Sequence, residues 1–316
     1  MGGALVALGL LGECRWDDDS AYAPRRIGVY LRTDSLLWWV PESGAPVRLP
    51  YKVRSIVPAD KEMVALAWGG DTVYFFSAGA FSARRSSPIA GGVLALASVA
   101  VGKSLYIYGV GSESGWLGWS PRPSAPLEET PAIPTLRGQR VVSAPSFVGI
   151  GDGKELRCVR PGEKTAFWQG TLPGPIEALW TESPTALAGV WRGRDTVYAF
   201  SALPQAGVVQ IDTARPARYR LRVASPYLQK NFGTEYLGTL SLLWEGRLEE
   251  GGLPQVQSIA ADFLGAWGYV AQRDTVWLYR LPEGVGRRQP CLTGVSAREI
   301  EVVGVYRYGS AEITMR

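Results

Sequence analysis

The sequence predicts an all-β protein, and three observations support this prediction. The first is a hairpin that recurs along the chain, in which a polar turn residue precedes a strand rich in aromatic and β-branched residues. The second is composition: 38 Gly and 22 Pro among 316 residues suit many short turns, and 14 Tyr and 12 Trp suit pleated strands. The third is that no amphipathic helical stretch of convincing length occurs.

The recurring hairpin appears six times in one register, at residues 34–39, 71–76, 103–108, 154–159, 195–200 and 274–279. The spacings between these copies are 37, 32, 51, 41 and 79 residues, so the last gap has room for a degenerate copy, for which 236–244 is the candidate. A further hairpin closes the chain at 301–315. The steps average about 39 residues, close to the length of a four-stranded propeller blade. The chain is therefore predicted to form a single β-propeller domain over 1–316.

The number of blades depends on which strand completes the last one. The C-terminal hairpin leaves its blade one strand short, and an exposed strand edge is costly, so an N-terminal strand is expected to pair with it. If residues 4–8 provide this strand, the chain forms eight blades, and if residues 21–30 provide it, seven. We predict eight blades in a ring closed by the N- and C-terminal strands, with seven as the alternative. The Pro- and Ser-rich segment 110–140 is predicted to be a long surface loop.

The chain contains no histidine, which excludes His-based catalytic triads and His-ligated metal sites. An enzyme built on this chain would have to use carboxylates, Tyr, Lys, Arg or an oxygen-ligated metal. Asp262 and Glu177 lie in apolar surroundings and are the weak candidates for a glycosidase or lyase pair. The absence of histidine favours a non-catalytic protein. We expect no cofactor and no metal, and the modest formal charge of +4 does not suggest nucleic acid as a partner.

The turns of the repeat carry several cations, and because these turns should open on one face of the disc, they predict a basic rim. The predicted rim residues are Arg32, Lys103, Lys154, Arg192, Arg194 and Arg273. Such a rim would hold an acidic protein partner. Neighbouring aspartates cancel part of this charge, so ordinary solvated turns are the alternative.

Two further sets of residues have competing interpretations. Trp116 and Trp119 are candidates for an exposed aromatic platform that binds a glycan or a peptide, while the alternative places at least one of them in the core. Cys158 occupies an apolar position of the repeat strand, which predicts a buried core residue, with a disulfide to Cys291 as the alternative.

The N-terminal segment 1–19 has an apolar run that ends near Cys14 and is followed by three aspartates. It resembles a lipoprotein signal, which would make Cys14 a lipidation site and place the protein at the cell envelope or surface, with membrane contact only through the lipid. No basic residue precedes the apolar run, and Glu13 stands where a small residue is usual. The alternative is that 4–8 forms a strand, and a cytoplasmic location stays open.

Segments 36–47 and 156–168 combine a strand, a Gly turn and a second apolar or Trp-bearing strand, and they resemble the repeat of quinoprotein-like propellers. That family includes quinone-dependent dehydrogenases and a propeller lipoprotein scaffold of the outer-membrane barrel assembly machinery. The dehydrogenases have a pair of adjacent cysteines, which this chain lacks. The resemblance therefore implies a protein-binding scaffold, such as a subunit of an envelope complex. A carboxylate-dependent carbohydrate-active enzyme and a glycan-binding module are the alternatives.

Overall fold

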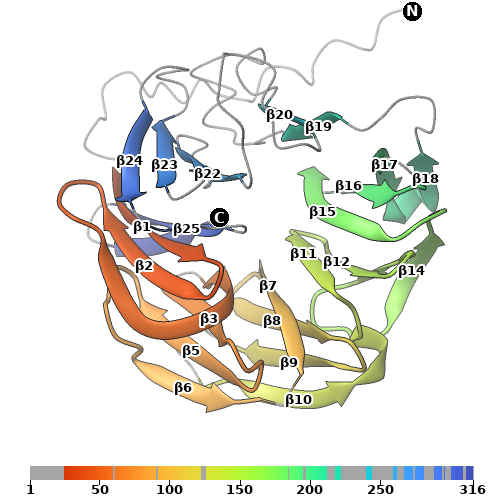
Figure 1. Cartoon of the computed structure of the whole chain (residues 1–316). Coiled ribbons are helices and arrows are strands. Elements are labelled where there is room, and N and C mark those ends of the chain that lie inside the picture. The colour runs from red at the N-terminus through yellow and green to blue at the C-terminus, as the bar shows by residue number, and fades with distance from the viewer. Residues whose placement is uncertain are drawn as a thin grey trace, which may run out of the picture.

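The computed structural model describes residues 25–59, 61–89, 92–121, 126–183, 185–194 and 197–211, and then 218–221, 240–243, 259–261, 267–272, 275–280, 288–293, 295, 300–308 and 311–315. These residues form an all-β fold (Figure 1). The predicted fold class is thereby confirmed at the level of secondary structure. The predicted N-terminal segment 1–19, with Cys14 and the strand 4–8, lies outside the described residues.

The described strands form seven antiparallel sheets, numbered here in chain order. Sheet 1 contains β25 (Ile300–Tyr308), β1 (Arg25–Thr33), β2 (Leu36–Pro41) and the first half of β3 (Val47–Ala59), with β26 (Ala311–Met315) paired to β25. Sheet 2 contains the second half of β3, β4 (Glu62–Ala67), β5 (Thr72–Ser77) and β6 (Arg85–Pro88). Sheet 3 contains β7 (Val93–Val101), β8 (Ser104–Gly111), β9 (Gly115–Ser120) and β10 (Glu128–Ile133).

The remaining sheets follow the same plan. Sheet 4 contains β11 (Arg140–Ala144), β12 (Phe147–Asp152), β13 (Glu155–Val159) and β14 (Ala166–Thr171). Sheet 5 contains β15 (Ile176–Ser183), β16 (Ala186–Arg192), β17 (Val197–Leu203) and β18 (Val208–Ile211). Sheet 6 is described only by β19 (Arg218–Leu221) and β20 (Leu240–Leu243), and the second of these lies within the predicted degenerate copy. Sheet 7 contains β21 (Ile259–Ala261), β22 (Trp267–Gln272), β23 (Thr275–Arg280) and β24 (Arg288–Thr293).

The sheets are arranged around a centre, and in sheets 3, 4 and 5 the first strands β7, β11 and β15 lie on the inside and the last strands on the outside (Figure 1). Strands of consecutive sheets contact one another in the order β21, β25, β3, β7, β11 and β15. Each hydrophobic cluster lies between two consecutive sheets, so that sheets 7, 1, 2, 3, 4 and 5 pack face to face. Since the middle strands are covered on both faces, their residues are buried on both sides: every residue of β4 is buried, and all except Glu62 are apolar.

The two ends of the described chain meet in sheet 1. Strand β1 pairs with β25 from Arg25↔Arg307 to Thr33↔Ile300. This pairing is the one expected for seven blades, in which residues 21–30 meet the C-terminal hairpin. Strand β3 then joins sheets 1 and 2, because its first half pairs with β2 and its second half with β4, with a bulge between Val53 and Ser55.

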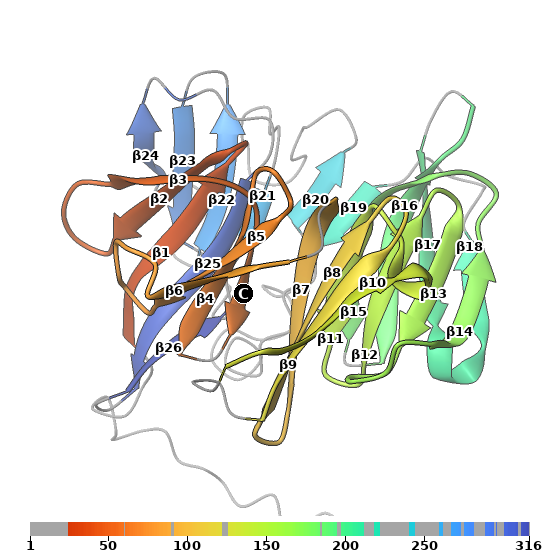
Figure 2. The same ribbon diagram turned by 90° about the horizontal axis from the view of Figure 1, so that it is seen from below.

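Because the strands are antiparallel, the connections alternate between two sides of the molecule, which Figure 2 shows side on. We call the side that bears the turns between the second and third strands face A, and the opposite side face B. The described connections from one sheet to the next also lie on face A, where backbone hydrogen bonds hold them to the turns. Examples are Leu172 N to Lys154 O (2.9 Å), Gln139 N to Gly151 O (2.9 Å) and Ile89 N to Asp71 O (2.8 Å).

The predicted repeat register is right for the turns at 34, 71 and 154 and wrong for the turn at 103. Lys103 joins the first and second strands of sheet 3, and the turn that matches the others lies near Glu113, between β8 and β9. With 113 in place of 103, the spacings of 32 and 51 become 42 and 41. The register failed because β8 has the same aromatic, β-branched pattern as the third strands elsewhere.

The same correction applies to 110–140, which was predicted to be a long loop and instead contains β9 and β10. The prolines of this segment suggested a loop, but Pro131 lies in the outermost strand of the sheet. No further strand pairs with that edge, so the N–H that proline lacks is not required there. The helices within the described ranges are two three-residue 3-10 turns, η1 (Pro134–Leu136) and η2 (Pro204–Ala206), and none of the described helices is long enough to cross a membrane.

Candidate functional site

The predicted rim residue Arg32 is not on the surface. It is 5% exposed, and its Nε lies 3.0 Å from Glu301 Oε2 on β25. The same Glu301 oxygen accepts a hydrogen bond from Ile56 N of sheet 2 at 2.8 Å. Arg32 therefore belongs to a buried clamp between sheets 1 and 2, and the prediction that it forms part of a binding rim is wrong.

Lys103 is exposed, but it lies on face B because its turn joins the first and second strands. It cannot share a rim with cations on face A. Arg273 lies outside the described residues. The predicted rim is thus reduced to Lys154 on the turn of sheet 4 and Arg192 and Arg194 at the turn of sheet 5, all of them exposed on face A.

Two arginines that sequence reasoning missed join these three. Arg137 lies on the connection from sheet 3 to sheet 4, and Arg140 begins β11, with its Nε 3.3 Å from Ile176 O of sheet 5. Both are exposed on face A. We call Arg137, Arg140, Lys154, Arg192 and Arg194 the basic patch. The missed pair follow a 3-10 turn rather than a repeat hairpin, so the hairpin register did not indicate them.

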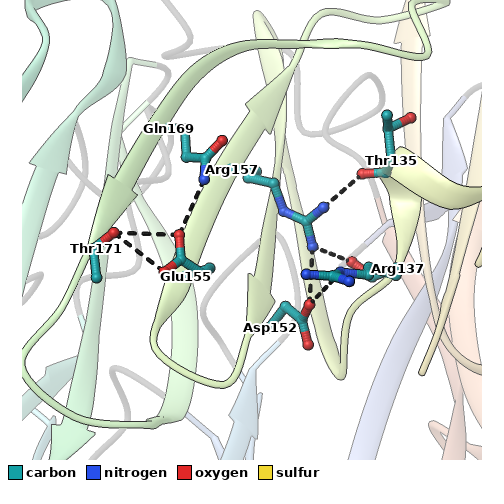
Figure 3. Close-up of polar contacts among 7 residues, drawn as sticks. All are labelled: Thr135, Arg137, Asp152, Glu155, Arg157, Gln169 and Thr171. Carbon is teal, nitrogen blue, oxygen red and sulfur yellow. Dashed lines mark hydrogen bonds and ion pairs between the residues drawn. The ribbon is translucent and has the colours of Figure 1, made fainter. Parts of the chain in front are cut away.

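An almost buried arginine positions one edge of the basic patch (Figure 3). Arg157 of β13 donates from Nη1 to Thr135 O (3.0 Å) and from Nη2 to Arg137 O (2.5 Å) and Asp152 Oδ2 (3.3 Å). Arg137 Nε lies 2.9 Å from the same Asp152 oxygen. Burial lowers the pKa of Arg157, while Asp152 opposes this shift. These bonds tie the sheet 3 to sheet 4 connection onto sheet 4, so Arg137 is presented by a fixed backbone.

The carboxylates near the basic patch are already engaged. Asp152 pairs with Arg137 and Arg157, and Glu177 Oε1 lies 2.7 Å from Arg192 Nε. Glu155 accepts hydrogen bonds from Gln169 Nε2 (3.0 Å) and Thr171 Oγ1 (3.2 Å), as Figure 3 shows.

The basic patch therefore has five exposed cations against the three carboxylates Asp152, Glu155 and Glu177, of which Asp152 and Glu177 form ion pairs with its arginines. The corresponding turns of sheets 2 and 3 carry the exposed acids Asp71 and Glu113 instead. Within the described part of the chain, Lys154 and Arg194 make no ion pair.

The predicted catalytic carboxylates do not form a described site. Asp262 lies outside the described residues. Glu177 is paired with the exposed Arg192, which contradicts the apolar surroundings that the prediction assumed for it. Among the described residues, no group of His, Cys, Asp or Glu side chains could hold a metal ion.

The predicted aromatic platform is corrected as well. Trp116 is fully buried between sheets 2 and 3, and Trp119 is partly buried, because β9 is an interior strand between β8 and β10. Cys158 is a buried free thiol, as the core interpretation predicted, and burial raises its pKa to about 12.

An exposed tryptophan was missed. Trp68, at the turn of sheet 2 on face A, is 47% exposed, and Arg54 lies over its ring with the guanidinium carbon 5.3 Å from the ring centroid. Trp68 directly follows β4, and a position at the end of a strand does not indicate from sequence whether the side chain is covered.

Comparison with protein-family models and with curated proteins finds no match. Similar solved structures include BamB from Moraxella catarrhalis, with 10% identity, a TM-score of 0.48 and coverage of 94% of each chain. A chain of the mitotic checkpoint complex has 9% identity, a TM-score of 0.49 and coverage of 92% of this chain and 85% of that one. The β-propeller domain of Cps50 (Swd1) from Myceliophteria thermophila has 11% identity, a TM-score of 0.46 and coverage of 92% and 97%. We draw no functional conclusion from similarities at this level.

Proposed function

We propose that this chain is a seven-bladed β-propeller that acts as a non-catalytic scaffold and binds an acidic protein surface through the basic patch. The propeller is supported by the contacts between strands of consecutive sheets, by the cores that lie between neighbouring sheets, and by the pairing of β1 with β25. Seven blades correspond to sheets 1–7, with β1 completing the blade that β25 begins.

The observation that carries the functional proposal is the basic patch itself. Its cations come from two neighbouring blades and face the same side, on turns and connections that backbone hydrogen bonds hold in place. A preorganised set of cations binds an acidic surface with little loss of backbone freedom. It also accelerates association through long-range attraction.

Charge reversal tests this proposal. The variant Lys154→Glu/Arg194→Glu removes two cations that make no ion pair within the described residues, so the fold should be retained. A fluorescent glutamate-rich peptide is the probe, and its anisotropy reports binding. We expect the variant to bind at least several-fold more weakly than the parent protein, and the difference to shrink between about 50 and 200 mM salt as charges are screened.

The matched control is Lys61→Glu/Lys103→Glu, which reverses two exposed lysines on face B and changes the net charge by the same amount. It should leave binding of the peptide unchanged. Equal weakening by both variants would mean that only net charge matters, and unchanged binding by the face A variant would exclude the basic patch as a site.

We further infer that the blades are of the quinoprotein-like kind. Sheet 4 contains the expected unit, because β13 is followed by Gly162 at a φ of +83° and then by β14, which carries Trp168.

An envelope location is proposed from the apolar run and Cys14 alone. The mass of the intact native protein tests it, since a lipidated Cys14 requires loss of residues 1–13, whereas an intact Met1 excludes it.

A further inference from the structure

Trp68 differs from the other exposed hydrophobic residues in its position. The large hydrophobic residues exposed within the described ranges are Val47, Trp68, Phe81, Val101, Leu203 and Val208. All except Trp68 lie at or beside turns and loops on face B, between the first and second or the third and fourth strands. Trp68 is therefore the one that shares a face with the basic patch.

Three backbone hydrogen bonds hold the turn around Trp68. Trp68 N donates to Lys52 O at 3.0 Å, Gly70 N donates to Ala67 O at 2.9 Å, and Val93 N donates to Gly70 O at 3.2 Å. Gly70 has a φ of +73°, and a Cβ at this position would lie 2.3 Å from Val93 O, so only glycine fits the turn. The indole is thus presented by a turn that cannot relax to cover it.

Two cations accompany the exposed ring. Arg54 covers part of one side of the indole, and its guanidinium can still donate hydrogen bonds outward. Lys52 is exposed where β3 passes from sheet 1 to sheet 2, next to the turn that carries Trp68. Asp71 is the exposed carboxylate of that turn. An apolar surface beside two cations and one anion favours a ligand that combines an apolar group with negative charge.

We propose that Trp68, Arg54 and Lys52 form an anchor site for an acidic peptide segment, in which an apolar side chain packs on the indole and flanking carboxylates pair with the two cations. This proposal rests on the proposed function, because it identifies the partner of face A as an acidic segment with an apolar anchor. Two cations favour carboxylates over the hydroxyl groups of a neutral sugar, so a peptide fits the site better than a neutral glycan. Partly exposed aromatic and arginine side chains are also the residues that dominate binding at protein interfaces.

Two glutamate-rich peptides that differ at one central position, Leu or Ser, provide the test. With the parent protein, the Leu peptide should bind about tenfold more tightly than the Ser peptide, which corresponds to about 1.4 kcal/mol from a well-packed anchor. In Trp68→Ala, the two peptides should bind with nearly equal affinity, so that the ratio falls to near one. Phe81→Ala, which removes an exposed aromatic residue from face B, is the matched control and should leave the ratio unchanged. Thermal unfolding of each variant checks that it is folded.

The two proposals fail in different ways. Lys154→Glu/Arg194→Glu should weaken both peptides while keeping the Leu to Ser ratio, and failure to weaken them counts against the basic patch alone. A ratio near one in the parent protein, a ratio that survives Trp68→Ala, or no binding of either peptide overturns the anchor site. Tighter binding of a lysine-rich Leu peptide, or of a neutral oligosaccharide, overturns it as well.

Discussion

The clamp between Arg32 and Glu301 offers a direct test of how the two ends of the chain hold together. Glu301 Oε2 receives Arg32 Nε at 3.0 Å and Ile56 N at 2.8 Å, and the two side chains are 6% and 17% exposed. Replacement of Glu301 by Ala would leave a buried guanidinium without its carboxylate and a backbone N–H without its acceptor. Breaking a buried ion pair by removing one partner costs about 3–5 kcal/mol of unfolding free energy.

The measurement is urea unfolding followed by tryptophan fluorescence, which compares the parent protein with Glu301→Ala. The matched control is Glu163→Ala, which breaks the exposed pair of Arg160 and Glu163 (3.8 Å) and should change the unfolding free energy by at most about 0.5 kcal/mol. The double variant Arg32→Met/Glu301→Gln should regain part of the loss, because it removes the buried guanidinium together with the carboxylate and keeps an acceptor for Ile56 N. If Glu301→Ala costs no more than Glu163→Ala, the clamp does not join these sheets as described.

Two further predictions concern buried groups. The Tyr108 hydroxyl of sheet 3 accepts a hydrogen bond from Gly162 N (2.8 Å) and donates one to Arg160 O (3.0 Å), both in a loop of sheet 4. Tyr108→Phe should therefore lower the free energy of unfolding in urea by about 1–3 kcal/mol and speed proteolysis of that loop. An unchanged cleavage rate would contradict the anchoring role of the hydroxyl. Cys158 should resist a thiol reagent in the folded protein at pH 8 and react on unfolding. Burial raises the pKa of Cys158 from 9.0 to about 12, so its contribution to stability is present below pH 9 and is lost as the pH rises toward 12. Cys158→Ala should therefore make the free energy of unfolding fall less steeply with pH above pH 9. An equally steep fall in this variant would show that another group is responsible.

Much of the architecture could be read from local patterns. A strand and a tight turn involve residues that are neighbours in the chain, so the alternation of residue types and the turn residues at 34, 71 and 154 predicted the hairpins correctly. Since the ends of antiparallel strands alternate between two sides, the same register placed Lys154, Arg192 and Arg194 on one face. The buried position of Cys158 followed from its register mates for the same reason.

Other features depend on contacts between residues far apart in the chain. Arg32 is buried because Glu301, 269 residues away, reaches it, and no local pattern contains that pairing. Strand β8 has the composition of a third strand but is a second strand, so only the packing of sheet 3 places Lys103 on face B. Trp116 lies near the start of β9 and Trp68 directly follows β4, so each is beside a turn between a second and a third strand. Trp116 is buried because sheets 2 and 3 pack over it, whereas Trp68 stays exposed at the turn of sheet 2. In this fold each face of a sheet packs against another sheet. The alternation of residue types along a strand therefore cannot show which side chains are exposed, because their exposure depends on the neighbouring sheets.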